Sequence, residues 1–257
     1  MAVTLEGGCR VSDMREGEPV VNGTLRIWNQ IGKATGAQAI SLRVMEFAPG
    51  LSPGIRNGDC DEILYVLGDE NQALEITIRI DDNEHRIGGD TGIYMRPRQT
   101  FVINNPNENP VVVISSRCPD PAATPEFVAP AAAFSSPSDS EGSPIFQLRN
   151  RAPQSTADRW YRVLVDDEVG SEQVTQFVGS IPPGRAPDHF HTYEEVLFIL
   201  KGEGRMWAGQ TNTSIGPGSC IFLPKRQVHC VENTGNGELR LLGVFYPAGS
   251  PSVRYEA

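Results

Sequence analysis

The chain has 257 residues, of which 39% are hydrophobic, and a formal net charge of −10 from 22 basic and 32 acidic residues. This composition supports a sizeable core and excludes global disorder. The acidic balance argues against a nucleic-acid partner, because phosphate binding depends on clustered Lys and Arg. The chain also holds 26 glycines and 20 prolines, which interrupt almost every apolar run. That pattern excludes helical bundles and favours many short strands.

No apolar run approaches the roughly 18 residues that a transmembrane helix needs, so we expect no membrane partner. The opening segment MAVTLEGGCR lacks the basic and apolar regions of a secretory signal. The five cysteines show no CxxC spacing, which indicates reduced thiols. These features predict a cytoplasmic protein.

Two segments of the chain resemble each other. The first contains DEILYVLGDE and GGDTGIYMRP, and the second contains EEVLFILKGEG and GPGSCIFLP. Glu62 lines up with Glu195, and Pro97 lines up with Pro224. The repeat is longer than the units of solenoids and propellers, so it indicates a duplicated domain. We expect a first domain at 1–118, a Pro/Ser-rich connector at 119–145 and a second domain at 146–257.

The segments within each repeat have the length and composition of strands. The apolar runs 63–67 and 196–200 are typical of strands that are buried on both faces. Residues 74–80 and 238–246 predict further strands, and an Asn-Gly pair before the latter fits a hairpin turn. The sequence therefore predicts two small antiparallel barrels or sandwiches, one in each repeat.

Three of the four histidines gather in the second repeat, at His189, His191 and His229. In a strand, residues i and i+2 face the same side, so His189 and His191 can reach one point, and Glu195 keeps their parity. Three imidazoles and a carboxylate form a strong site for a divalent first-row metal and leave two octahedral positions open. The alternative is a hydrogen-bonded core cluster, but burying these groups without a metal would be costly.

The second repeat resembles the cupins. It carries HxHxxxExxxxxxG from His189 to Gly202, and the second motif of that family at Gly218, Pro224, His229 and Asn233. Because both repeats share the pattern, the chain looks like a bicupin. The resemblance implies an all-β fold of two cupin (double-stranded β-helix or jelly-roll) barrels. It also implies one metal ion per chain, bound by His189, His191, Glu195 and His229, with Mn, Fe, Ni, Co and Zn all acceptable to these ligands.

Two features depart from the cupin motifs. Four residues rather than five separate Gly184 from His189, and Arg226 stands where these proteins usually have Gly. The first repeat departs further, because Arg56 and Gly58 stand at the places that match His189 and His191. Phe101 or Val102 takes the place of His229, and Glu62 alone survives, so we expect no metal there. Arg56, Asp59, Asp61 and Glu62 are candidates for an ion-pair cluster in its cavity.

The remaining candidates surround the predicted metal. Arg185, Tyr193, Trp207 and Phe222 are candidate substrate contacts, against the ordinary alternatives of a surface arginine and core aromatic residues. Glu195 is the candidate catalytic residue, as a ligand that can also accept a proton. The opposite strand parity of Asp188 and Glu194 predicts solvated positions. Residues 158–162 are a candidate edge strand.

Three functions agree with this site. The first is a metal-dependent oxygenase, of dioxygenase type, acting on a small organic substrate bound at the metal. The second is a non-oxidative metalloenzyme, namely a decarboxylase, lyase or sugar isomerase, which needs an acid or base beside the metal. The third is a non-catalytic protein that binds a metal or small molecule. The resemblance to bicupins also implies a homodimer.

Overall fold

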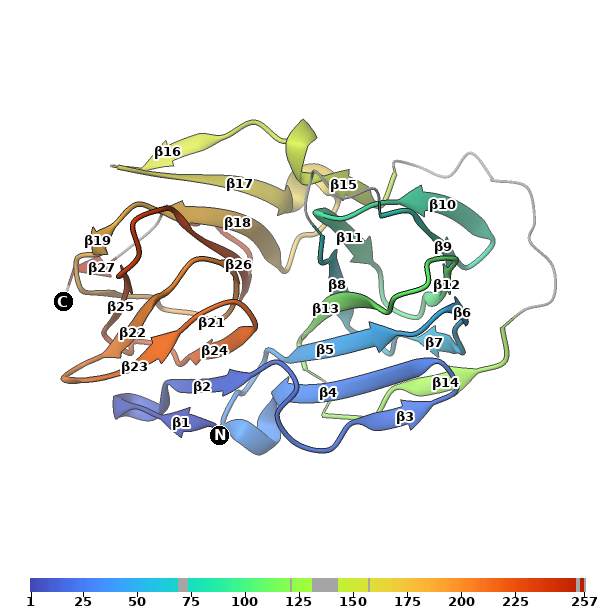
Figure 1. Ribbon diagram of the computed structural model, residues 1–257, viewed down its shortest axis with the longest axis horizontal. Coiled ribbons are helices and arrows are strands. Elements are labelled where there is room, and N and C mark those ends of the chain that lie inside the picture. The colour runs from blue at the N-terminus through green and yellow to red at the C-terminus, as the bar shows by residue number, and fades with distance from the viewer. Residues whose placement is uncertain (69–73, 121, 131–142, 157, 253–254, 257) are drawn as a thin grey trace.

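The computed structural model describes residues 1–68, 74–120, 122–130, 143–156, 158–252 and 255–256. Antiparallel strands make up most of this part of the chain (Figure 1), and its helices are short 3-10 turns at Glu6–Gly8, Lys33–Thr35, Leu148–Asn150 and Asp167–Val169. None of these helices has the length and apolar character that crossing a membrane would require.

The first half of the chain is a sandwich of two sheets. The larger sheet has the order β15-β11-β8-β13-β5-β4-β3, and the smaller has the order β10-β9-β12-β7-β14, with β6 also paired to β12. The strands are β3 (Val20–Asn22), β4 (Leu25–Ile31), β5 (Leu42–Phe47), β6 (Gly50–Leu51), β7 (Gly54–Arg56), β8 (Asp61–Val66), β9 (Ile76–Ile80), β10 (Asn83–Ile87), β11 (Thr91–Met95), β12 (Thr100–Asn105), β13 (Val111–Cys118), β14 (Glu126–Val128) and β15 (Ile145–Gln147).

The second half repeats this arrangement, which confirms the predicted all-β fold of two jelly rolls. Its larger sheet has the order β1-β2-β24-β21-β26-β18-β17-β16, and its smaller sheet has the order β23-β22-β25-β20-β27, with β19 also paired to β25. The strands are β1 (Val3–Thr4), β2 (Arg10–Asp13), β16 (Gln154–Thr156), β17 (Arg159–Val165), β18 (Thr175–Ile181), β19 (Gly184–Arg185), β20 (His189–Phe190), β21 (Glu194–Lys201), β22 (Gly204–Ala208), β23 (Thr211–Ile215), β24 (Ser219–Leu223), β25 (His229–Asn233), β26 (Leu239–Tyr246) and β27 (Tyr255–Glu256).

Strand pairing joins parts of the chain that lie far apart in sequence. The N-terminal strand β2 pairs with β24, so the first residues of the chain extend the large sheet of the second half (Figure 1). Conversely, β15 begins at the last residue of the predicted connector and pairs with β11 of the first half, and β14 lies inside the predicted connector and pairs with β7. The domain limits at 118 and 146 stay a prediction, and residues 131–142 of the connector lie outside the described residues.

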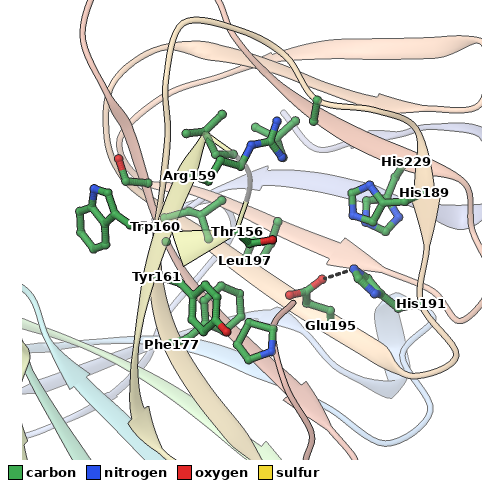
Figure 2. Close-up of a pocket in the computed structure, with 17 residues that line it drawn as sticks. Thr156, Arg159, Trp160, Tyr161, Phe177, His189, His191, Glu195, Leu197 and His229 are labelled. Atoms are coloured by element: carbon green, nitrogen blue, oxygen red, sulfur yellow. Dashed lines mark ion pairs between the residues drawn. The ribbon is translucent and has the colours of Figure 1, made fainter. Parts of the chain in front are cut away.

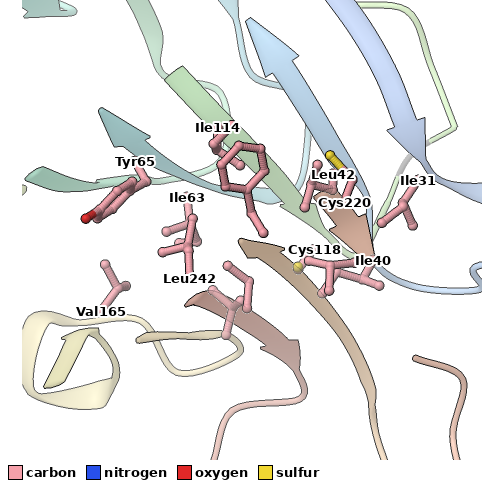
Figure 3. Close-up of a cluster of buried hydrophobic side chains, with 14 of the residues drawn as sticks. Ile31, Ile40, Leu42, Ile63, Tyr65, Ile114, Cys118, Val165, Cys220 and Leu242 are labelled. Carbon is pink, nitrogen blue, oxygen red and sulfur yellow. The ribbon is translucent and has the colours of Figure 1, made fainter. Parts of the chain in front are cut away.

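The two apolar strands predicted to be buried on both faces, β8 and β21, are indeed buried on both. Along β8, Leu64 faces the interior of the first sandwich, and Ile63 and Tyr65 face a third core between the halves (Figure 3). Along β21, Leu197 faces its own sandwich and Val196 faces the same shared core. The large sheets of the two halves therefore pack against each other through a continuous apolar layer.

One residue predicted to be solvated, Glu194, also joins the halves. Glu194 at the start of β21 is 2% exposed. Its carboxylate accepts hydrogen bonds at 2.8 Å from the backbone N–H groups of Gln38 and of Ala39. The prediction of a solvated side chain was wrong, because the outward face of β21 meets the first half instead of water.

Candidate metal centre

The three histidines of the second half converge at one end of its sandwich. His189 on β20 pairs directly with His229 on β25, and His191 follows two residues after His189. One ring nitrogen from each lies within 4.8 Å of the others, which is close enough for all three to ligate one ion. Figure 2 shows the three rings on the same wall of a cavity.

Backbone carbonyls orient two of these rings. Nδ1 of His189 lies 3.0 Å from the carbonyl oxygen of Pro187, and Nδ1 of His229 lies 2.7 Å from that of Gln227. A carbonyl oxygen only accepts, so each Nδ1 carries the proton and each Nε2 keeps its lone pair free for a metal. Hydrogen bonds from the ring nitrogen that does not bind the metal commonly orient metal-ligating histidines.

The protonation of the site also fits a cation. Burial and, as a smaller cause, the neighbouring His189 together lower the pKa of His229 to about 4, so this imidazole is neutral at pH 7 as a ligand must be. Glu195 on β21 is 6% exposed, and one of its oxygens lies 3.5 Å from Nε2 of His191. Burial raises the pKa of Glu195 to about 8. A divalent ion here would supply the charge that keeps this carboxylate ionised.

Aromatic stacking supports one face of the His191 ring. The Tyr193 ring stacks on the His191 ring with centroids 4.8 Å apart and planes 10° apart. Tyr193 in turn stacks on Phe245 of β26, with centroids 4.5 Å apart. Tyr193 was predicted to contact substrate, but this geometry makes it a support for a candidate ligand, and it does not line the cavity.

The histidines and Glu195 open onto a cavity of about 120 Å³. The opposite wall comes from β17 and β18, which contribute Arg159, Tyr161 and Phe177 (Figure 2). Leu197 and Leu241 add apolar surface, and Thr156 and Ser180 add hydroxyl groups. The volume is below the roughly 300 Å³ at which drug-sized ligand sites begin, so it suits a molecule of few heavy atoms.

The other three predicted substrate contacts lie away from this cavity. The guanidinium of Arg185 lies over the Trp207 ring at 4.2 Å and donates to Asp188 at 3.0 Å. Trp207 donates its indole N–H to Glu232 at 2.7 Å. Met206 and Ala208 on either side of Trp207 belong to the interior core, so Trp207 lies on the outer face of its sheet.

Phe222 also faces away from the interior of the second sandwich. Its neighbours Ile221 and Leu223 face the interior of the second sandwich, and Phe222 points into the core between the halves. The residues that do line the cavity include Arg159 and Tyr161, from the segment that sequence analysis identified only as an edge strand. Strand β17 lies between β16 and β18, and its side chains reach over the open side of the sandwich.

Among the described residues of the first half, strand register shows which ones stand at the places of the metal ligands, and it corrects the matching made from sequence. His189 pairs with His229, and in the first half Ile55 pairs with Phe101, so Ile55 rather than Arg56 holds the place of His189. Asn57, two residues later, is buried, whereas Arg56 is exposed. The error arose because one more residue separates Ile55 from Glu62 than separates His189 from Glu195.

The expected ion-pair cluster of the first half does not form. Arg56 pairs with Glu126 at 3.1 Å, and Asp59 pairs with Arg98 at 2.6 Å. Asp61 accepts from the Tyr94 hydroxyl at 3.1 Å. Glu62 instead pairs with the buried Arg43.

Comparison with known proteins agrees with this architecture. The cupin domain family matches residues 177–245. Auxin-binding protein 1 of Arabidopsis thaliana is 27% identical over 158 residues, covering 56% of this chain and 77% of that protein. Auxin-binding protein T92 of Nicotiana tabacum is 32% identical over 88 residues, covering 30% of this chain and 47% of that protein.

Two solved structures share the fold across both halves. A variant of Bacillus subtilis oxalate decarboxylase superposes with a TM-score of 0.73 at 12% identity, covering 93% of this chain and 77% of that one. A putative glyoxylate-induced protein from Pseudomonas aeruginosa gives 0.72 at 16% identity, covering 96% and 91%. The fold and the family match identify a protein of the cupin superfamily. With two such folds in one chain, the protein is a bicupin.

Proposed function

We propose that this bicupin is a metal-dependent enzyme that acts on a small organic substrate in the second half. The observation that carries the proposal is that three histidine donors within 4.8 Å of one another line a cavity of about 120 Å³. In this proposal His189, His191, His229 and Glu195 hold one divalent ion. The ion supplies Lewis acidity and, for Fe or Mn, a path for electrons.

The cavity wall supports a substrate that carries negative charge. Arg159 lines the cavity on the side opposite the histidines, with its side chain 16% exposed (Figure 2). A guanidinium matches the two oxygens of a carboxylate, so we propose that Arg159 orients a carboxylate or enolate whose other end meets the metal. Phe177, Leu197 and Leu241 exclude water around the substrate and so strengthen both interactions.

For the reaction we propose first an oxygenase of dioxygenase type. The apolar wall around the candidate ligands favours it, because a water-poor cavity protects a reactive intermediate from hydrolysis. The test is oxygen uptake by Fe- or Mn-loaded protein with a panel of enolic, catecholic and small carboxylate compounds. If no member of the panel stimulates oxygen uptake, the oxygenase proposal is wrong.

A second candidate is a non-oxidative metalloenzyme, such as a decarboxylase, lyase or isomerase. Arg159 favours it, because this chemistry needs a polar group beside the metal, and the name of the oxalate decarboxylase neighbour points to a small dicarboxylate for that protein. Turnover under strict anaerobiosis separates the two reactions. Metal loading without turnover of either kind would support the third function, a binding protein.

We also propose a cytoplasmic location and a homodimer. All five cysteines are free and buried, as expected of a protein from a reducing compartment. Light scattering of the purified chain tests the dimer, which follows only from the likeness to other bicupins.

A further inference from the structure

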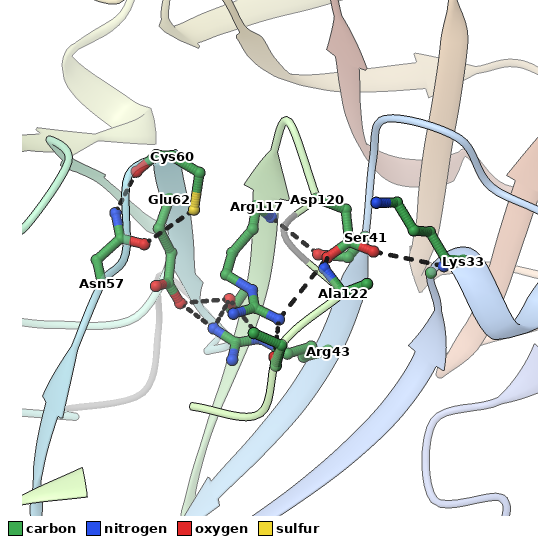
Figure 4. A network of polar contacts seen from close by, with 12 residues as sticks. Lys33, Ser41, Arg43, Asn57, Cys60, Glu62, Arg117, Asp120 and Ala122 are labelled. Atoms are coloured by element: carbon green, nitrogen blue, oxygen red, sulfur yellow. Dashed lines mark hydrogen bonds and ion pairs between the residues drawn. The ribbon is translucent and has the colours of Figure 1, made fainter. Parts of the chain in front are cut away.

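The first half holds a second cavity that the proposed metal chemistry does not use. It has a volume of about 280 Å³ and lies at the end of β4, beside the 3-10 turn at Lys33–Thr35. Two buried arginines line it, Arg43 on β5 and Arg117 on β13, together with Lys33 and Asp120 (Figure 4). We propose that this cavity binds a small oxyanion, a carboxylate or a phosphate, through Arg43 and Arg117.

Strand register shows how the two arginines relate to the metal half. In the second half, Glu195 pairs with Phe245. In the first half, the surviving Glu62 pairs with Arg117, so Arg117 holds the place of Phe245. One strand further on, Ser115 pairs with Arg43 where Gly243 pairs with Phe177.

Two guanidinium groups therefore replace two aromatic rings beside the same carboxylate. In the second half, Phe177 and Phe245 contact each other with centroids 6.0 Å apart, and Phe177 lines the cavity of the candidate metal centre. In the first half, two guanidinium groups stand at these two positions. The exchange puts positive charge where the second half has apolar rings, and positive charge favours an anion.

Hydrogen-bond acceptors of the protein satisfy only some of the N–H groups of each guanidinium. Arg43 is 1% exposed, donates from Nη2 to Ser115 at 2.9 Å and forms an ion pair with Glu62. Arg117 is 7% exposed and donates from Nη2 to the carbonyl oxygen of Ala123 at 2.8 Å. Within the described part of the chain, Nη1 of Arg43 and Nε of Arg117 find no hydrogen-bond acceptor. Buried donors of this kind are costly unless a bound group accepts from them.

The side chains around the cavity carry one more positive charge than negative charge, which one bound anion would balance. Glu62 balances Arg43, and Asp120 lies 3.7 Å from Arg117. Lys33 lines the cavity and adds a further positive charge. Burial lowers the pKa of Arg117 and the nearby Arg43 lowers it further, whereas Glu62 and Asp120 raise it. A carboxylate or phosphate supplies both the charge and the missing acceptors.

The test is isothermal titration calorimetry on the full chain, with inorganic phosphate and with malonate as probes. The His229→Ala variant is the titrated protein, because weakening the metal site weakens anion binding in the second half, where Arg159 remains. We expect saturable binding of at least one probe with one site per chain. The probe that binds more tightly identifies the anion as a phosphate or a carboxylate, and absence of saturable binding by both overturns the proposal.

Two variants in the same background locate the site. Arg43→Lys keeps the charge beside Glu62 but removes the free Nη1 group, and Arg117→Met removes the second donor. We expect each to weaken binding by about tenfold or more, as loss of a charged hydrogen bond does. Arg205→Met removes a charge from an exposed side chain of the second half and should leave the affinity unchanged. Equal affinity in all three variants would overturn the proposal, and Arg117→Met keeps the test decisive if Arg43→Lys fails to fold.

Discussion

The ring of Phe177 lies directly over the Cα of Gly243 on the neighbouring strand. A Cβ built on Gly243 would overlap that ring, so the absence of a side chain at this position lets the ring stay at the edge of the cavity. Phe177 lines the cavity between the candidate metal ligands and β17. The width of the cavity therefore depends on a residue that does not itself line it.

We expect Gly243→Ala to displace Phe177 and to destabilise the protein by about 1–3 kcal/mol, the usual range for overpacking a core. Urea denaturation measures the free energy of unfolding, and the substrate KM should rise more than kcat falls. Gly179→Ala is the matched control for the urea measurement alone, because a Cβ there meets Phe177 at an ordinary 3.4 Å but Gly179 itself lines the cavity. Equal effects of the two substitutions would contradict this account.

The metal site predicts a difference between histidines. Replacing His229 by Ala removes one of three converging donors, and we expect the variant to lose stoichiometric metal after dialysis, as measured by mass spectrometry of the metal. His85→Ala is the control, since His85 lies on β10 of the first half. One metal ion per chain in both variants would show that the assignment of the ligands is wrong.

Glu194 predicts that the halves are coupled in stability. Glu194→Ala leaves the N–H groups of Gln38 and Ala39 without their acceptor, and each such loss costs about 1–3 kcal/mol. We expect a lower midpoint in urea. Glu194→Gln, which keeps one acceptor oxygen, should recover part of the loss, and Glu203→Ala on the exposed turn should be neutral. No difference between Glu194→Ala and Glu203→Ala would refute the prediction.

Alkaline stability should reflect the thiol of Cys9. Cys9 is buried in the core of the second half, and burial raises its pKa from 9.0 to about 12. The folded state keeps this proton where the unfolded state has lost it. The thiol's contribution is therefore complete below pH 9.0 and is lost as the pH rises toward about 12.

Urea unfolding at a series of pH values checks that the free energy of unfolding falls as the pH rises through this range. The slope that Cys9 adds is at most about 1.4 kcal/mol per pH unit in the alkaline range. Cys9→Ala should be less stable at neutral pH, because it leaves a cavity, but should lose less stability on going to alkaline pH. If its alkaline slope equals that of the unchanged protein, another group causes the loss.

Local patterns predicted the fold well and the cavity poorly. The i, i+2 spacing of His189 and His191 brought their rings to one face, because strand parity is a local property. The same parity would have excluded Trp207, since its neighbours Met206 and Ala208 face inward. It could not have excluded Phe222, because the run 220–223 is apolar throughout and both of its faces are buried. The sequence could not place Arg159 in the cavity, because that location depends on how β17 pairs with β18.

Other features depended on contacts that sequence does not reveal. The place of Ile55 was hidden by the one-residue difference in spacing, and only pairing with Phe101 reveals it. Glu194 was assigned to solvent because nothing in its own strand indicates a partner 155 residues away. Strand pairing within the first half determines the place of Ile55, and packing between the halves determines the burial of Glu194.

The pairing of β2 with β24 has a consequence for the order in which the protein can be made. Arg10 pairs with Phe222, so the segment around Arg10 joins its sheet only after the roughly 200 residues that separate the two strands have been synthesised. Until then Leu5, Cys9 and Val11 lack the core that finally buries them. The second half thus matures last, and with a contact of such high sequence separation we expect slow folding and a period of exposed apolar surface that a chaperone would recognise.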